Sequence, residues 1–130
     1  MYPCAPEGGE SWCAIVCETD AEWRALVAYI GAPDWARDPA LAEAAGRKAR
    51  EAELDARLAA FTATQEASAL AARLQAVGVP AGVVQSCADL HVDPQLASRV
   101  AFPLVDHPEM GRTPYETWAF RLGPDQAPPR

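Results

Sequence analysis

The sequence predicts an α+β fold: a mostly helical small domain with a short antiparallel sheet formed from the two ends of the chain. Three observations support this prediction. Half of the 130 residues are hydrophobic, and alanine, the strongest helix former, is very abundant. Apolar residues recur with helical spacing through the middle of the chain, whereas short candidate strands flanked by glycine and proline lie near its ends. At this length the chain can bury a self-supporting core as one domain.

The N-terminal residues predict a β-hairpin. Segments 2–4 and 11–17 are candidate strands on either side of a turn at residues 6–9, which contains one proline and two glycines. Successive side chains of the second strand alternate between two faces, and we expect Trp12, on one of these faces, to pack in the core.

A helix follows the hairpin. Thr19 and Glu22 form a capping box, because the hydroxyl and the carboxylate can satisfy free backbone N–H groups reciprocally. One apolar stripe then runs at positions i, i+3, i+4 and i+7, and Gly31 ends the helix. The stripe consists of Trp23, Leu26, Val27 and Ile30.

Three more helices are expected in the middle of the chain. Asp38 and Pro39 open a short one, with proline at the first helical position. A longer helix is predicted from about residue 47 to 61, with a charged outer face in contact with solvent. Thr64 can cap the next helix, and Gly78 ends it.

The last third alternates short elements. We expect a strand at 81–84, a helix capped by Ser86 and Asp89, and a helical turn opened by Asp93 and Pro94. Strands are predicted at 102–106 and about 113–120. Residues 123–130 contain three prolines and are interpreted as a tail or linker after a domain at 1–122.

Composition excludes several classes of function. The formal net charge of -7 argues against a nucleic-acid partner, which would require clustered Lys and Arg. No apolar run is long enough to cross a membrane, and no basic segment leads into an apolar stretch at the N-terminus. We therefore expect a cytoplasmic protein without a membrane partner.

The residues that carry chemistry are few. Cys4, Cys13, Cys17 and Cys87 form no CxxC pair, so we predict reduced, packed thiols and no metal site. Cys87 follows the Ser86 cap, and a helix N-terminus can lower the pKa of a thiol, but packing is the favoured interpretation. His91 and His107 lie at turns or helix boundaries, where a general base would need a convergent partner. No catalytic residue is assigned.

A series of short patterns in a fixed order resembles the small, C-terminal domain of the family III CoA-transferases (the CaiB/BaiF family). The resemblance covers nearly the whole chain, and the order of the patterns carries it more than any one motif. The patterns begin with Tyr2-Pro3-Cys4 before a glycine turn. They continue with TDAEWRAL at 19–26, GAPDW at 31–35, LQAVGVPAGVV at 74–84, DPQL at 93–96 and DHPEMGR at 106–112.

The resemblance implies an enzyme that moves CoA between carboxylic acids through an aspartyl-CoA thioester. Members are interlocked homodimers whose nucleophilic Asp lies in a large Rossmann-like domain, outside the segment that this chain resembles. The isolated chain is therefore predicted to be inactive, to bind no cofactor of its own, and to meet the CoA thioester only within the full enzyme. Tyr2, next to the position of a missing glycine-rich loop, is the candidate substrate contact; a frayed terminal residue is the competing interpretation.

Two alternatives remain open. The α-methylacyl-CoA racemases share the resemblance but place an acid/base carboxylate at a position that falls on Thr19, with Glu18 one residue before it. A threonine cannot remove an α-proton, so this alternative requires a register shift to Glu18, for which a solvated carboxylate at a helix N-terminus is the simpler interpretation. The second alternative is a non-catalytic module that binds a partner protein through an exposed apolar face.

Overall fold

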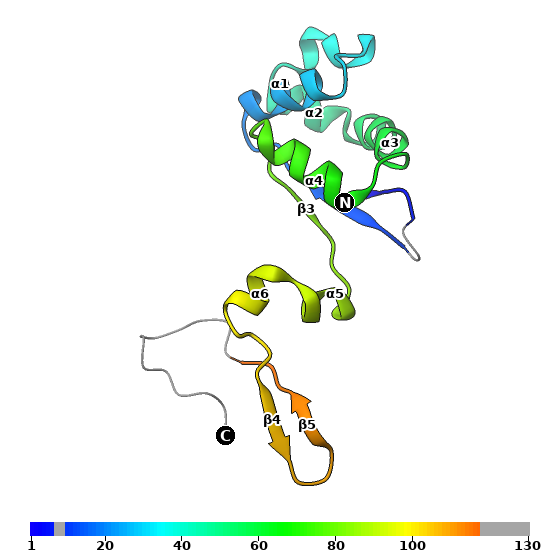
Figure 1. Cartoon of the computed structure of the whole chain (residues 1–130). Coiled ribbons are helices and arrows are strands. Elements are labelled where there is room, and N and C mark those ends of the chain that lie inside the picture. Colours follow the sequence, from blue (N-terminus) through cyan, green and yellow to red (C-terminus); the bar gives the residue numbers. More distant parts are fainter. Residues whose placement is uncertain (7–9, 118–130) are drawn as a thin grey trace. The chain divides into compact units, whose positions relative to one another are not determined.

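The computed structural model describes residues 1–6 and 10–117 and divides the chain into two compact units, Met1–Val84 and Gln85–Arg130 (Figure 1). Helices combined with two small antiparallel sheets confirm the α+β class. The first unit contains the elements β1 (Tyr2–Pro3), β2 (Trp12–Ile15), α1 (Asp20–Tyr29), α2 (Ala44–Ala49), α3 (Glu51–Thr62), α4 (Ala67–Ala76) and β3 (Ala81–Val83). Two 3₁₀ helices, η1 (Asp34–Arg37) and η2 (Pro39–Leu41), connect α1 to α2.

The strands from the two ends of the chain belong to separate sheets. In the first unit β2 lies between β1 and β3, and both pairings are antiparallel. Cys13 is thereby paired with Tyr2 on one side and with Val83 on the other. The turn after α4 brings β3 back along β2, where the Val16 N–H donates to the Pro80 carbonyl at 3.0 Å. The expected sheet from both ends is thus replaced by an N-terminal hairpin completed by a strand from the middle of the chain.

Helix α1 forms as the sequence predicts. The Thr19 hydroxyl accepts from the Glu22 N–H, and the Glu22 carboxylate accepts from the Thr19 N–H, which completes the capping box. Trp23 and Leu26 of the predicted stripe are 5% and 2% exposed. Gly31, at a φ of +84°, lets the Ala32 N–H reach back into the last turn and ends the helix.

The long helix expected from about residue 47 is interrupted. Helix α2 ends at Ala49, and α3 begins at Glu51 after a non-helical Arg50 (φ −117°, ψ 22°). The Arg50 guanidinium binds Asp38 and Glu53 at this break. The break lets α2 lie against η2, while α3 lies against β1. Gly46 permits this approach, because a Cβ there would overlap the Ala40 carbonyl oxygen.

The cap of α4 is Glu66 rather than Thr64. Its carboxylate accepts from the Ser68 and Ala69 N–H groups, both at 2.6 Å. The Thr64 hydroxyl instead donates to the Phe61 carbonyl at 3.0 Å, so it serves the end of α3. Gly78 ends α4 as expected, at a φ of +82°.

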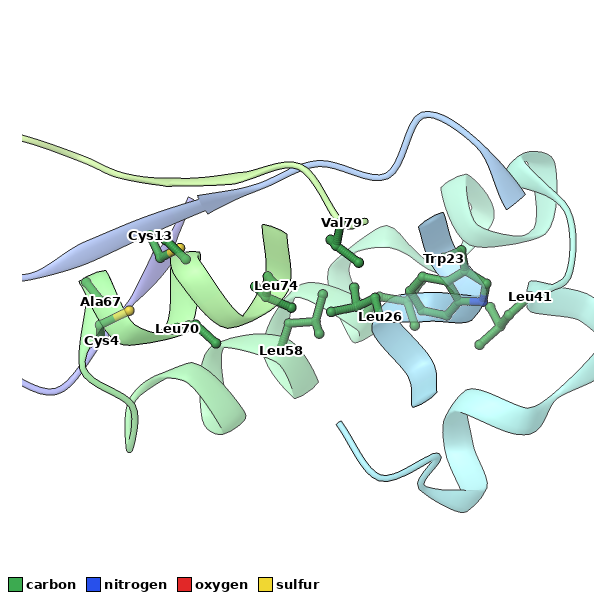
Figure 2. Close-up of a cluster of buried hydrophobic side chains, with 12 residues drawn as sticks. Cys4, Cys13, Trp23, Leu26, Leu41, Leu58, Ala67, Leu70, Leu74 and Val79 are labelled. Atoms are coloured by element: carbon green, nitrogen blue, oxygen red, sulfur yellow. The ribbon is translucent and has the colours of Figure 1, made fainter. Parts of the chain in front are cut away.

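The core of the first unit is a row of buried side chains that runs from the sheet to η2 (Figure 2). Cys4 and Cys13 lie beside Ala67 and Leu70 of α4, and Trp23 and Leu41 lie at the far end of the row. The expectation that Trp12 packs in this core is wrong, since 37% of its surface is exposed. Strand alternation turns Cys13 toward the helices and therefore turns Trp12 to the opposite face.

The second unit contains α5 (Cys87–Val92), α6 (Pro94–Ser98), β4 (Leu104–His107) and β5 (Gly111–Pro114). The capping box of Ser86 and Asp89 is confirmed, and the Asp93 carboxylate caps α6. Strands β4 and β5 pair with each other as an antiparallel hairpin. The end of the expected return strand (118–120) and the tail at 123–130 lie outside the described residues. Among the helices that the structure describes, none is long and apolar enough to cross a membrane.

Candidate functional site

Tyr2, the candidate substrate contact, lines a pocket of about 330 Å³ in the first unit. The pocket is formed by residues of β1, β2, α1, α2 and α3, together with the segment that precedes α1. Its buried lining consists of four apolar side chains, Trp23, Leu26, Leu54 and Leu58, and one cation, Arg47. Its more exposed lining combines the apolar residues Ile15, Val16 and Ala44 with polar ones, Tyr2, Cys17, Lys48, Glu51 and Asp55. The pocket therefore offers an apolar surface beside hydrogen-bonding groups, a combination typical of small-molecule sites.

The Tyr2 side chain is fixed by a hydrogen bond across the pocket. Its hydroxyl donates to Asp55 Oδ1 at 2.7 Å. Burial raises the pKa of the Tyr2 hydroxyl well above its ordinary value, and the hydrogen bond to Asp55 raises this pKa further. Tyr2 is therefore a neutral hydrogen-bond donor near neutral pH, and its oxygen can still accept a hydrogen bond from a ligand.

The backbone around Tyr2 is also tied down. Tyr2 pairs with Cys13 in the sheet, and the buried Thr62 hydroxyl donates to the carbonyl of Pro3 at 2.7 Å. These contacts connect β1 to β2 and α3, so Tyr2 is not a frayed terminal residue. No local sequence pattern predicts the Tyr2–Asp55 pair, because the two residues lie 53 positions apart.

Cys17 lies in the same pocket as a half-buried thiol. Burial is the main cause that raises its pKa; the nearby Glu22 carboxylate adds to the rise and Arg47 opposes it. Burial also raises the pKa values of Cys4 and Cys13. A thiol nucleophile requires a lowered pKa, so these three residues are suited to packing. Cys87, which the sequence predicted to be packed, is exposed.

Arg47, a buried cation, holds one side of the pocket together, and sequence reasoning missed this role. It is 9% exposed, and its guanidinium donates to Asp20 Oδ1 at 2.8 Å and to the carbonyls of Leu41 and Ala42, each at 3.1 Å. The guanidinium also lies 5.6 Å from the centre of the Trp23 ring. Arg47 thus joins the start of α1 to the end of η2. No local signal reveals this, since Asp20 lies 27 residues away.

The acid/base corner of the racemase alternative is occupied by helix capping. Thr19 is the N-cap of α1, and the Glu22 carboxylate accepts from the N–H groups of Glu18 and Thr19 at 2.8 and 2.9 Å. The hydrogen bond from the Thr19 N–H is the main cause that lowers the pKa of the Glu22 carboxyl. The Glu18 side chain is exposed. These observations favour the interpretation of Glu18 as a solvated carboxylate.

The two histidines lie in the second unit and are used in packing and turn formation. His107 Nδ1 accepts from the backbone N–H groups of Glu109 and Met110, at 3.2 and 3.1 Å, within the β4–β5 turn. The His91 ring lies 4.5 Å from the Phe102 ring, measured between centres. In the part of the chain that the structure describes, no group of three or more His, Cys, Asp or Glu residues could hold a metal ion.

Comparison with known proteins identifies the family. The model of CoA-transferase family III matches residues 1–130. The chain belongs to the family III CoA-transferases. It is 40% identical to the probable CoA-transferase Rv1866 of Mycobacterium tuberculosis, with 100% of this chain and 16% of that protein covered. It is 30% identical to the succinyl-CoA–D-citramalate CoA-transferase of Chloroflexus aurantiacus, with 90% of this chain and 29% of that protein covered.

Solved structures of similar fold agree with this family. A CAIB/BAIF family protein from Brucella suis has a TM-score of 0.68 at 28% identity, covering 98% of this chain and 33% of that one. Rv3272 from M. tuberculosis has a TM-score of 0.74 at 23% identity, covering 94% of this chain and 33% of that one, and at this identity the likeness concerns the fold. The chain spans less than a third of the length of either curated relative, Rv1866 or the C. aurantiacus enzyme.

Proposed function

We propose that the chain acts as the small domain of a CoA-transferase that moves CoA between carboxylic acids through an aspartyl-CoA thioester. The observation that supports this function is membership of the family III CoA-transferases across residues 1–130. The catalytic Asp is proposed to lie in a large domain outside the segment that this chain matches. In keeping with this, the carboxylates that line the Tyr2 pocket are engaged: Asp55 by Tyr2, and Glu51 by Lys48 at 2.6 Å.

Within that enzyme, the Tyr2 pocket is proposed to form a wall of the acyl site. The buried apolar side chains of the lining offer a surface to an acyl chain, and the Tyr2 hydroxyl can contact a polar group of the substrate. Asp55 acts as a positioning residue, because its carboxylate fixes the orientation of the Tyr2 hydroxyl.

An assay of the purified chain tests whether it is catalytically complete. Succinyl-CoA and D-citramalate are suitable substrates, since they appear in the name of the C. aurantiacus relative. We expect no transfer of CoA by the chain alone, because a covalent route needs a placed carboxylate and donors for the developing oxyanion. Turnover by the chain alone would overturn the proposal that the nucleophile lies elsewhere.

A chimera tests the role of Tyr2. The chain replaces the matching segment of the C. aurantiacus enzyme, and folding of the chimera is checked by circular dichroism before the assay. We expect Tyr2→Phe to lower kcat/KM about tenfold, the equivalent of about 1.4 kcal/mol, while Tyr29→Phe leaves it unchanged. Tyr29 is the matched control because it packs against Phe61 at 6.2 Å between ring centres and does not line the pocket. Equal effects of the two substitutions would count against a substrate contact at Tyr2.

The resemblance also leads us to propose an interlocked homodimer located in the cytoplasm. Analytical ultracentrifugation of a full-length enzyme that contains this segment would check the dimer. A monomer with full activity would contradict this part of the proposal.

A further inference from the structure

One face of the three-stranded sheet has no cover within the first unit. Because side chains alternate along a strand, the register places one set of residues together on the side away from the core. We call this set the outer sheet face; it consists of Pro3, Trp12, Ala14, Val16, Pro80 and Val84. The helices that contact the sheet, α3 and α4, pack on the opposite face, where Cys13 is fully buried against the core.

The outer sheet face is apolar although it is open. Trp12, Val16 and Val84 are 37%, 49% and 41% exposed. None of the six residues is charged, and among their side chains only the Trp12 indole bears a hydrogen-bonding group. An antiparallel sheet with one face in water normally alternates apolar and polar residues, whereas apolar residues on both faces are typical of strands that are covered on both sides. The composition of β2 and β3 therefore matches a sheet with a second cover.

The comparisons indicate where the second cover comes from. The segment that this chain matches makes up 16% and 29% of the two curated relatives and 33% of the solved structures described above. Most of a family III polypeptide thus lies outside the matched segment. An uncharged face is best covered by another uncharged, apolar surface, because a charge placed there would lose water and gain no partner.

We propose that the outer sheet face docks against an uncharged, apolar surface of the family III CoA-transferase polypeptide that lies outside the segment matched by this chain. This docking depends on membership of the family and on the register of the sheet, and it is independent of the role of Tyr2 in the acyl site. A contiguous apolar surface of this kind marks a site of protein contact.

Labelling of an introduced cysteine tests the proposal. Val84→Cys places a thiol on the outer sheet face, where Val84 is 41% exposed and is not part of the Tyr2 pocket lining. Val77→Cys places a matched thiol elsewhere, at the C-cap of α4, where Val77 is 46% exposed. Each variant is prepared in the 130-residue chain and in a chimera that carries the chain in place of the matching segment of Rv1866, which covers all of it. Peptide mapping by mass spectrometry separates the introduced thiol from the native ones.

We expect maleimide to label Val84→Cys quickly in the isolated chain and at least about ten times more slowly in the chimera, while Val77→Cys reacts at similar rates in both. Equal rates for Val84→Cys in the two proteins would overturn the proposal. Slow labelling already in the isolated chain would overturn it as well, because the cover would then be residues 85–130 or a second copy of the chain.

A measurement on unaltered Rv1866 keeps the proposal testable if the chimera does not fold. Hydroxyl-radical footprinting compares the peptide aligned with residues 12–16 between native and urea-unfolded Rv1866. Because the core protects the position aligned with Cys13 in either case, oxidation is measured residue by residue. Strong protection at the positions aligned with Trp12 and Ala14 in the native protein supports the proposal, and oxidation there at the rate of the unfolded protein would overturn it.

Discussion

The two units of the chain use similar local signals and differ in what they bury. Each begins a helix with a capping box, Thr19 with Glu22 in the first unit and Ser86 with Asp89 in the second. The first unit adds a continuous row of buried side chains (Figure 2). From residue 85 to 117, by contrast, no described residue is buried. Similar caps therefore begin helices in both units, whereas among the described residues only the first unit has a buried core.

The second unit is held mainly by short-range contacts. The Asp93 carboxylate caps α6, and His107 Nδ1 accepts two backbone N–H groups in the hairpin turn. The rings of His107 and Tyr115 lie 6.4 Å apart, which adds a contact between the hairpin and the residue that follows it. A two-stranded hairpin without a buried face is only marginally stable in water. We therefore expect the second unit to open more readily than the first.

Truncation of one leucine in each unit gives the largest expected contrast. Leu74 is fully buried, so Leu74→Ala should lower the free energy of unfolding by about 2–5 kcal/mol. Leu104 is 55% exposed, so Leu104→Ala should change this free energy by less than about 0.5 kcal/mol. Both effects are measured by urea unfolding, with hydrogen exchange of the β2 and α4 amides as the probe of the first unit. A comparable loss from Leu104→Ala would show that the second unit is part of the same cooperative core.

Arg47 tests whether a buried cation contributes as much as the apolar row. Arg47→Ala leaves the Leu41 and Ala42 carbonyls and the Asp20 carboxylate without their partner, so we expect a loss of about 2–4 kcal/mol. The matched control is Lys48→Ala, one residue along the same helix. The Lys48 side chain is 76% exposed and forms a surface ion pair, so its removal should cost about 0.5 kcal/mol or less. Thermal and urea unfolding check the difference, which would be absent if Arg47 were only a surface charge.

Removal of each N-cap hydroxyl is expected to have a smaller effect, with different results in the two units. Thr19→Ala and Ser86→Ala each remove an N-cap, which costs about 1 kcal/mol. Helix α1 should persist after Thr19→Ala because Trp23 and Leu26 remain buried. Helix α5 has no buried residue, so Ser86→Ala should largely melt it. Backbone chemical shifts measured by NMR distinguish these outcomes, and an intact α5 in Ser86→Ala would show that other contacts hold it.

The helix caps and helix ends that the sequence predicted correctly depend on residues close together in the chain. The Thr19 capping box, the Gly31 and Gly78 helix ends and the Ser86 cap all involve neighbours within a few positions. Even here local competition can mislead, because Glu66 supplies a better-placed oxygen for α4 than Thr64.

What the sequence did not predict depends on contacts between distant residues. The pairing of β3 with β2, the burial of Arg47 beside Asp20 and the hydrogen bond from Tyr2 to Asp55 each join segments that only the fold brings together. Tyr2 could be proposed as a site residue only through the family resemblance. Its pocket, its fixed hydroxyl and its raised pKa follow from the packing of β1 against α3.

Acid titration gives the smallest expected effect, and it should distinguish the two units by the pH at which their capped helices, α1 and α5, are lost. Backbone and side-chain hydrogen bonds lower the pKa values of Glu22 and Asp89 below their ordinary values of 4.5 and 3.8. A lowered pKa in the folded state means that the capping contribution is present above the ordinary value and is lost as the pH falls through the folded pKa. Each cap should therefore be fully present above the ordinary pKa of its carboxyl, 4.5 for Glu22 and 3.8 for Asp89, and should weaken as the pH falls below that value.

The consequence for each helix should again follow burial. We expect α5 to lose its helical NMR shifts as Asp89 is protonated, while α1 retains them until the core of the first unit unfolds. Asp89→Asn removes the titrating group, so in this variant the shifts of α5 should no longer change with the midpoint of Asp89. If α1 and α5 lost their helical shifts at the same midpoint, the two units would unfold together in acid, and the contrast between a buried core and local capping would not describe this chain.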